Sequence, residues 1–146
     1  MKRDSSLMKT ALDSNVISAI FGLEPPSDAL IQLLGRVRLE GALVICGAVY
    51  AEIHAIPRMT PGLLAEFLAD IGIAVEAQTG FEDWRVTGNV FAQYAVRRRK
   101  TGDGVAKRLL ADFIIGTHAA THCDRLLTLD PTRYKQGFPA LTLLEV

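Results

Sequence analysis

The sequence predicts an α/β fold in which a parallel sheet is covered by helices. Short, continuously apolar segments alternate with segments of helical apolar spacing along all 146 residues. Parallel strands need crossover connections and are buried on both faces, so they are apolar throughout rather than alternating. Composition agrees with a folded chain, because 49% of the residues are hydrophobic and only 22% are charged.

Five short apolar runs are the predicted strands. Asp13, Gly47 and the pair Asp130-Pro131 end three of them, as expected of residues that form turns or begin helices. The five runs cover residues 9–12, 42–46, 73–75, 125–129 and 141–144.

Helices are predicted between these runs from apolar spacing and from capping residues. Ser27 supplies an N-cap, and Thr60-Pro61 combines a cap with proline at the first helical position. The first predicted helix runs through Ile17, Ile20 and Phe21, and the second begins at Ser27 with its apolar face on Leu30, Leu33, Leu34 and Val37. The third runs through Val49, Ile53 and Ile56 and ends at Pro57. The last three cover residues 61–71, Phe81 to the basic run 97–100, and 112–122.

The chain is predicted to be one domain over residues 8–146, preceded by a disordered leader over 1–7, with Met8 as an alternative start. The N-terminus has no apolar signal region, and no apolar run approaches the roughly 18 residues of a membrane span. Cys46 and Cys123 are too few for a disulfide framework and lie in apolar surroundings, as in a reducing compartment. We therefore expect a cytoplasmic protein with no membrane contact.

Four acidic residues are predicted to meet at one edge of the sheet. Asp13 and Asp130 follow strands, Glu52 lies in the helix after a strand, and Asp112 begins a helix that leads into one. In parallel sheets ligands bind beyond the carboxyl ends of the strands, where all four should lie. Asp124 precedes the strand that Asp130 follows, so about five residues at ~3.3 Å each put the two roughly 17 Å apart. We therefore assign Asp124 a capping or turn role.

Four carboxylates in one cleft repel one another unless a cation joins them. Mg²⁺ or Mn²⁺ takes oxygen ligands, keeps several waters and uses one or two direct carboxylates, so some of the four must act through water. Such an ion presents an activated water and neutralises phosphate oxygens, as phosphodiester hydrolysis requires. The alternative for each aspartate alone is a turn former or a helix cap.

Four segments in order resemble the PIN domain, specifically the VapC-type toxin ribonucleases of prokaryotic toxin–antitoxin pairs: "ALDSNVI", "AVYAEI", "ADFIIGTHA" and "DRLLTLD". The resemblance implies a three-layer sandwich with a five-stranded parallel sheet in the order 3-2-1-4-5. It also implies an Mg²⁺- or Mn²⁺-dependent endoribonuclease that forms a homodimer and is inhibited by a cognate antitoxin protein. On this resemblance the catalytic and metal-binding residues are Asp13, Glu52, Asp112 and Asp130, and the supporting polar residues are Ser14, Asn15 and Thr128. Leu129 stands where many relatives have a basic residue.

Charge is balanced overall, with 16 basic and 16 acidic side chains, so an RNA partner needs a local basic patch. The dense basic residues, which we predict to contact RNA phosphates, are Arg97, Arg98, Arg99, Lys100, Lys107 and Arg108. A solvated helix end explains such a run equally well.

Two other patterns have simpler explanations. His118 and His122 lie one helical turn apart, but no third zinc ligand follows in sequence, so we expect partly exposed helix residues. Trp84, Phe91 and Tyr94 have the spacing of core or dimer-interface residues.

The leading hypothesis is thus a metal-dependent endoribonuclease that is the toxin of a toxin–antitoxin pair. One alternative is a catalytically inactive PIN-like module that binds RNA or protein. Another is a receiver-type phosphoacceptor domain, although "LDSN" offers a single acid where that class has an adjacent pair.

Overall fold

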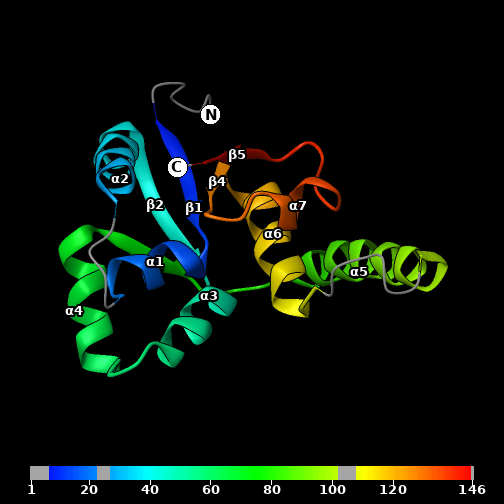
Figure 1. The fold of residues 1–146 in the computed structure, drawn as a ribbon, viewed down its shortest axis with the longest axis horizontal. Coiled ribbons are helices and arrows are strands. Elements are labelled where there is room, and N and C mark those ends of the chain that lie inside the picture. The colour runs from blue at the N-terminus through cyan, green and yellow to red at the C-terminus, as the bar shows by residue number, and fades with distance from the viewer. Residues whose placement is uncertain (1–6, 23–26, 102–107, 146) are drawn as a thin grey trace.

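A five-stranded parallel sheet forms the centre of the computed structural model, which describes residues 7–22, 27–101 and 108–145 (Figure 1). The predicted leader, residues 1–7, falls outside this part of the chain except for Leu7. The order of the strands is β3-β2-β1-β4-β5, which confirms the predicted 3-2-1-4-5 topology. Receiver domains have the order 2-1-3-4-5, so the phosphoacceptor hypothesis is wrong. The strands are β1 (Met8–Leu12), β2 (Gly41–Cys46), β3 (Ile73–Glu76), β4 (Arg125–Leu127) and β5 (Thr142–Leu144).

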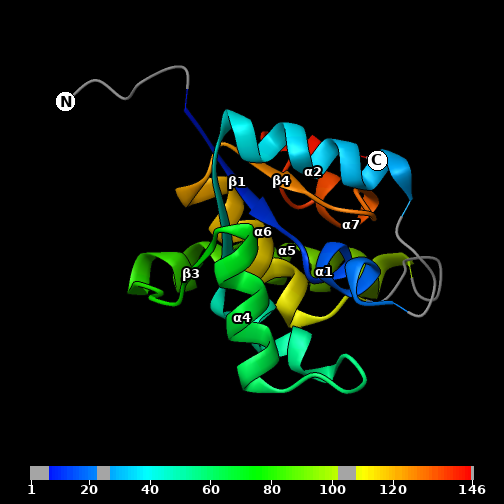
Figure 2. The ribbon, with the colours of Figure 1, turned by 90° about the vertical axis from the view of Figure 1, so that its left-hand side faces the viewer.

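Helices cover both faces of the sheet, as the predicted three-layer sandwich requires. Helices α1, α2 and α4 lie on one side and α5 and α6 on the other (Figures 1 and 2). The helices are α1 (Ser14–Ile20), α2 (Asp28–Glu40), α3 (Gly47–Glu52), the 3-10 turn η1 (Ile53–Ala55), α4 (Pro61–Ile71), α5 (Phe81–Thr101), α6 (Leu110–His122) and α7 (Thr132–Lys135). None of the helices described is long and apolar enough to cross a bilayer.

The predicted helix caps are confirmed. The Ser27 hydroxyl accepts a hydrogen bond from the Leu30 amide at 3.1 Å, and the Thr60 hydroxyl accepts one from the Leu63 amide at 3.1 Å. Pro61 is the first residue of α4, where a missing amide proton costs nothing.

The sequence prediction extended β4 too far and missed α7. We predicted a strand over 125–129, but β4 ends at Leu127. Beyond it, the Thr128 amide still donates to the Leu144 carbonyl of β5 at 3.3 Å, and the Asp130 amide donates to the Thr128 hydroxyl at 3.1 Å, a local bond typical of a bend. The bend leads into the short helix α7 in place of a simple turn at Asp130-Pro131.

Apolar side chains from the strands and from both helix layers form the core. Tyr94 is buried and its ring lies 5.2 Å from that of Phe113, so its predicted core role is confirmed. Trp84 is 48% exposed, so α5 does not carry it into the core of a single chain. Cys46 is buried and Cys123 half-buried, and both are free thiols.

The amino ends of β1 and β4 are joined by Asp124. Its carboxylate accepts a hydrogen bond from the Lys9 amide at 2.7 Å, and its own amide donates to the Lys9 carbonyl at 2.8 Å. The predicted structural role of Asp124 is therefore confirmed. Nearby, the buried Arg125 donates to Thr10 at 2.9 Å and to Glu40 at 2.6 Å, so its charge is paired.

We predict that Gly116→Ala destabilises the protein by about 1–3 kcal/mol in urea unfolding. A Cβ atom at Gly116 would lie 2.2 Å from the buried ring of Phe138, which follows α7, so the rigid ring would have to shift. The control is Gly88→Ala in α5, where a Cβ meets nothing within 4 Å and should stabilise the protein by about 0.5–1 kcal/mol. Equal effects of the two substitutions would contradict the packing of α6 against Phe138.

Candidate active site

Asp13 is the buried centre of the acidic edge. It directly follows β1, is 1% exposed and caps α1, because its Oδ1 accepts a hydrogen bond from the Ser14 amide at 2.8 Å. Its own amide donates to the Leu127 carbonyl of β4 at 3.0 Å. The carboxylate is therefore held at the point where two neighbouring strands end.

Two hydroxyl groups hold the other oxygen of Asp13. Thr128 donates to Oδ2 at 2.8 Å and Tyr134 donates to the same atom at 2.7 Å. Burial, together with the negative charge of Asp13, raises the pKa of the Tyr134 phenol, so the phenol keeps its proton and remains a donor. Both donors are neutral, so they orient the carboxylate without cancelling its charge.

Glu52 lies beside Asp13 at the end of α3. Its Oε1 accepts a hydrogen bond from the Ser14 hydroxyl at 3.1 Å, so Ser14 joins the two acids. Burial raises the pKa of Glu52; the bond from Ser14 opposes this shift, and repulsion from Asp13 and Asp112 adds to it. The negative charge of Glu52 is therefore disfavoured first by burial and then by the two neighbouring carboxylates.

Asp112 lies in the first turn of α6, where the helix dipole favours a carboxylate. It is 7% exposed, and its Oδ2 accepts a hydrogen bond from the Leu109 amide at 3.2 Å. Its Oδ1 lies 3.7 Å from the guanidinium of Arg133. These contacts give polar partners to the one carboxylate inside the apolar run "LLADFIIG".

Asp130 belongs to the same edge but has its own partners. Thr132 donates to it at 2.6 Å and the Nε of Arg133 donates at 2.8 Å. The hydrogen bond from Thr132, followed by the nearby charge of Arg133, outweighs burial and lowers the pKa of Asp130. Asp130 is thus a partly exposed, ionised carboxylate on the outer side of Arg133.

Arg133 and Tyr134 are the site residues that the sequence analysis missed. Burial lowers the pKa of Arg133, but the charges of Asp112, Asp130 and Asp13 outweigh this and raise it. The sequence feature that could have revealed them is the segment "DPTRY", in which an arginine and a tyrosine closely follow Asp130. We interpreted this segment as a turn and did not examine its side chains.

The acids form an open cup rather than a closed cage of ligands. Asp13, Glu52 and Asp112 lie close enough to shift the pKa of Glu52, yet no three of the four acids offer oxygens that are all within 4.8 Å of one another. A hard cation that keeps several waters and binds one or two carboxylates directly does not need three ligand oxygens so close together. The donor set, oxygen atoms with excess negative charge, therefore suits Mg²⁺ or Mn²⁺.

The predicted supporting residues connect α1 to the loop after β4. The Asn15 amide group donates to the Thr128 hydroxyl at 3.3 Å, and its carbonyl oxygen accepts from the Leu129 amide at 3.1 Å. Ser14 and Thr128 contact Asp13 directly. All three predicted residues thus lie in one hydrogen-bond network with the acids.

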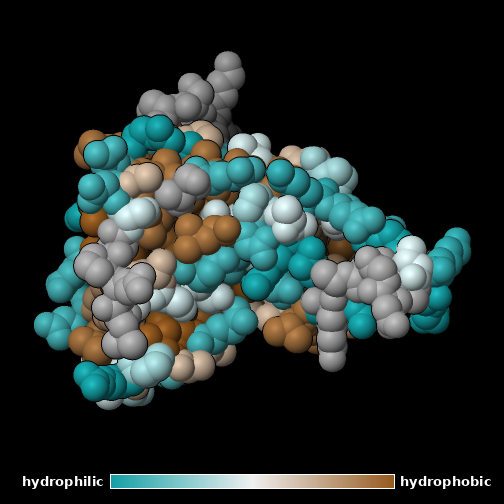
Figure 3. Space-filling view, in the orientation of Figure 1, coloured by the Kyte–Doolittle hydropathy of each residue, from teal (hydrophilic) through white to brown (hydrophobic). Residues whose placement is uncertain are grey.

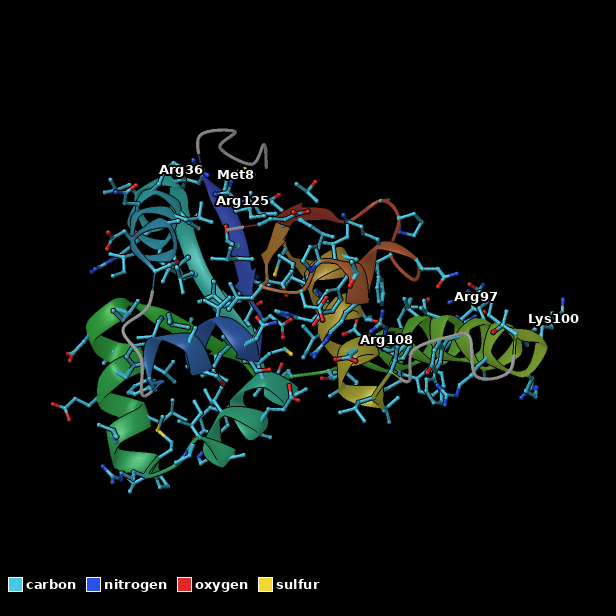
Figure 4. The ribbon with its side chains drawn as sticks, viewed as in Figure 1. Met8, Arg36, Arg97, Lys100, Arg108 and Arg125 are labelled. Atoms are coloured by element: carbon cyan, nitrogen blue, oxygen red, sulfur yellow. The ribbon has the colours of Figure 1, made fainter. Side chains whose placement is uncertain are left out.

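The predicted basic residues that the structure describes extend from the far end of α5 to a position nearer the body of the protein (Figure 4). Arg97 and Lys100 lie along the last turns of α5, and Arg108 lies between α5 and the body of the protein (Figure 4). Arg108 is close enough to Asp130 to contribute to its lowered pKa. Hydrophilic residues extend across the middle of this face and out along α5 (Figure 3). Lys107 lies outside the described residues.

The prediction that His118 is a partly exposed helix residue is wrong. Its side chain is buried beneath the sheet, and its Nε2 lies 2.8 Å from Oε1 of Glu76 on β3. Sequence spacing could not reveal this contact, because 42 residues separate the two side chains. His122 is half-exposed as predicted and bonds to Asp83 at 2.9 Å.

Comparison with known proteins identifies the family of the chain and solved structures with a similar fold. The family model described as "PIN domain" matches residues 10–137. Among solved structures, VapBC2 from Rickettsia felis, bound to a DNA fragment from their promoter, has a TM-score of 0.62 at 17% identity, covering 95% of this chain and 99% of that one. FitAcB from Neisseria gonorrhoeae has a TM-score of 0.59 at 19% identity, covering 93% and 96%. No curated protein sequence matches the chain.

We predict that Glu52→Gln raises the melting temperature at neutral pH in metal-free buffer. The raised pKa means that the folded protein binds this proton more tightly than the unfolded chain does, so stability falls as pH rises from the ordinary glutamate range through the raised value. Glutamine removes the cost of burying a charge together with the repulsion from Asp13 and Asp112, and its advantage should vanish below the ordinary glutamate pKa, where the side chain is protonated in both the folded and the unfolded state. Thermal melts across pH measure this difference.

Glu66→Gln, on the exposed side of α4, is the control for loss of one negative charge. If Glu52→Gln were less stable than the parent at neutral pH without metal, the inferred repulsion among the acids would be wrong.

Proposed function

The chain belongs to the PIN domain family, and on that basis we propose that it is a divalent-metal-dependent endoribonuclease, the toxin of a toxin–antitoxin pair. The observation that carries the proposal is the state of Asp13. This carboxylate is buried at the carboxyl edge of the sheet, beside Glu52 and Asp112, and its side-chain donors are neutral hydroxyls and an amide. A protein that used Asp13 only as a helix cap would have no need to gather further acids around it.

In this proposal Asp13, Glu52 and Asp112 hold Mg²⁺ or Mn²⁺, some directly and others through water. The bound metal supplies a water of lowered pKa and neutralises phosphate oxygens. Hydrolysis would leave 5′-phosphate and 3′-hydroxyl ends. Thr128 and Tyr134 keep one oxygen of Asp13 in place, so its remaining lone pairs keep a constant direction.

Asp130 completes the proposed acidic quartet from the outer side. Its oxygens accept hydrogen bonds from Thr132 and Arg133, so we assign it a water-mediated contact with the metal. Arg133 lies between Asp130 and Asp112 and has one of its contacts at a longer 3.7 Å. Its guanidinium can therefore offer protons to a phosphate oxygen that enters the cup.

RNA would reach the acids along the basic residues of α5 and the start of α6. The proposed phosphate contacts are Arg97, Arg98, Arg99, Lys100, Lys107 and Arg108. A local cationic surface is required because the chain carries no net charge. Arg99 and Lys100 are exposed on α5, and Arg108 is close enough to Asp130 to help lower its pKa, so basic side chains stand both along α5 and near the acids.

Family membership and the resemblance to VapC-type toxins also support the remaining parts of the proposal. We infer that a cognate antitoxin protein inhibits the enzyme, that two copies form a homodimer, and that the protein acts in the cytoplasm. The two free thiols agree with a reducing compartment.

One observation favours the second candidate, a catalytically inactive PIN-like module that binds RNA or protein. Arg133 already contributes positive charge to Asp112, Asp130 and Asp13. If this guanidinium were sufficient counter-charge, the acids would need no metal. Metal binding therefore separates the two candidates.

We predict that Asp13→Asn lowers Mn²⁺-dependent RNA cleavage at least about 100-fold, since each decade of rate corresponds to about 1.4 kcal/mol of transition-state stabilisation. Asparagine can still cap α1 and accept from Ser14, and the hydroxyls of Thr128 and Tyr134 can rotate to accept from its amide group, so the fold should persist. The parent should gain thermal stability from Mn²⁺, about 2.7 kcal/mol at 100 times the dissociation constant, and the variant should lose this gain. Cleavage of labelled RNA and melting curves measure both effects.

Asp70→Asn, at an exposed position of α4, should behave like the parent in both assays. Purifying the variants in parallel excludes a contaminating nuclease. Undiminished cleavage by Asp13→Asn would refute the assignment of the site, and an absence of Mn²⁺ stabilisation in the parent would favour the inactive module.

For the basic surface, we predict that replacing Arg99 and Lys100 together by alanine raises KM for RNA and leaves kcat nearly unchanged. The salt dependence of binding should also weaken, because the loss of two phosphate contacts reduces the slope of log K against log salt by about 1.4. Filter binding across salt concentrations measures this change. The matched control is Arg36 and Arg38 to alanine on the distant α2 (Figure 4). If both pairs had equal effects, only general charge would matter and the proposed path would be wrong.

A further inference from the structure

A second group of ligand-type side chains lies where the end of β3 meets the second half of α6, away from the acidic cup. Glu76 is the last residue of β3, His118 lies in α6 and Cys123 directly follows α6. The Nε2 of His118 is 2.8 Å from Oε1 of Glu76 and 3.9 Å from Sγ of Cys123. The three ligand atoms all lie within 4.8 Å of one another. Among the described residues, this is the one trio of acids, histidines and cysteines that meets this distance.

This trio is separate from the acidic cup. Asp112 is in the first turn of α6, and six residues at a rise of 1.5 Å put His118 about 9 Å further along the helix. The two groups also differ in chemistry, because the cup offers only oxygen atoms whereas the trio offers one nitrogen, one sulfur and one oxygen.

We propose that Glu76, His118 and Cys123 bind a divalent transition-metal ion of the zinc type. Imidazole and thiolate select zinc, cobalt and similar ions, whereas Mg²⁺ prefers oxygen atoms. Zinc bonds of ~2.0–2.3 Å in a tetrahedron separate neighbouring ligands by roughly 3.3–3.8 Å. The observed 2.8 Å and 3.9 Å need only small side-chain adjustments to reach that range.

A pocket at the end of β3 gives solvent and ions access to Glu76. This pocket of about 340 Å³ is lined by Lys9, Glu76 and His122, among others, so it reaches the trio at Glu76. It has room for a water as the fourth ligand. His122 stands on its wall, with its ring centroid 6.0 Å from that of His118.

Two features of the metal-free state must change when the ion binds. Lys9 forms an ion pair with Glu76, and burial raises the pKa of the Cys123 thiol to about 12. The Lys9 side chain is 28% exposed and can turn into water, and a bound zinc ion deprotonates a coordinating thiol outright. Burial meanwhile lowers the pKa of His118, which keeps its imidazole in the neutral form that binds metal.

The bound ion would act as a structural clamp. It would join the edge strand β3 to α6 and to the segment that enters β4, and α6 also positions Asp112. Ligands from three places in the fold come together only in the native state, so their metal binding favours folding.

The test is a Co²⁺ titration of the full chain, followed by absorbance. We expect one equivalent of Co²⁺ to produce a thiolate-to-cobalt charge-transfer band in the near ultraviolet, which Zn²⁺ abolishes by competition and excess Mg²⁺ does not. Cys123→Ser should eliminate the band, and Cys46→Ala should retain it. His118→Gln should weaken Co²⁺ binding at least about tenfold, whereas His54→Gln, at a partly exposed position near α3, should leave it unchanged.

Far-ultraviolet circular dichroism of each variant shows whether it folds. The trio is assigned when the folded His118→Gln variant binds Co²⁺ more weakly and the folded Cys123→Ser variant gives no charge-transfer band. No band in the parent, or a band that survives Cys123→Ser, overturns the proposal. Asp13→Asn should keep the cobalt band while losing RNA cleavage. Failure of the trio and failure of the nuclease assignment are therefore distinguishable.

Discussion

The arrangement of the acidic edge depends on one carboxylate, that of Asp13, and on the three segments that hydrogen-bond to it. Ser14 at the start of α1, Thr128 after β4 and Tyr134 in α7 all donate to its oxygens. A buried carboxylate without donors would be costly, so these contacts are a condition of the fold as well as of the site. They also explain why α7 lies against the carboxyl end of β1, which brings Arg133 to the same edge.

Charge at this edge is only partly balanced by the protein. Arg133 contacts Asp112 and Asp130 from one side, whereas Asp13 and Glu52 share a single neutral donor, Ser14. Burial is the main cause of the raised pKa of Glu52, and repulsion from Asp13 and Asp112 adds to it. A site of this kind is pre-organised for a cation, because the repulsion that weakens the metal-free protein becomes attraction once positive charge is present.

Helix α6 links two groups of side chains with different ligand chemistry. Its first turn presents Asp112 to an oxygen-lined cup, and its later turns present His118 to a carboxylate and a thiol. Ligand type separates hard from borderline ions, so the two groups would not compete for the same metal. The same helix carries Gly116 between them, where the ring of Phe138 packs too closely for any side chain.

The sequence by itself determined the positions of the strands and the caps at Ser27 and Thr60, because apolar runs and capping residues act locally. It also determined the edge on which Asp13, Glu52 and Asp112 lie, because parallel strands all end on one side of the sheet. Tertiary structure alone decided that Arg133 and Tyr134 join the acids, and that His118 is buried against Glu76. These outcomes depend on contacts between residues up to 121 positions apart, for which no local pattern exists. The exposure of Trp84 was decided in the same way, because helical spacing identifies an apolar face but not what covers it.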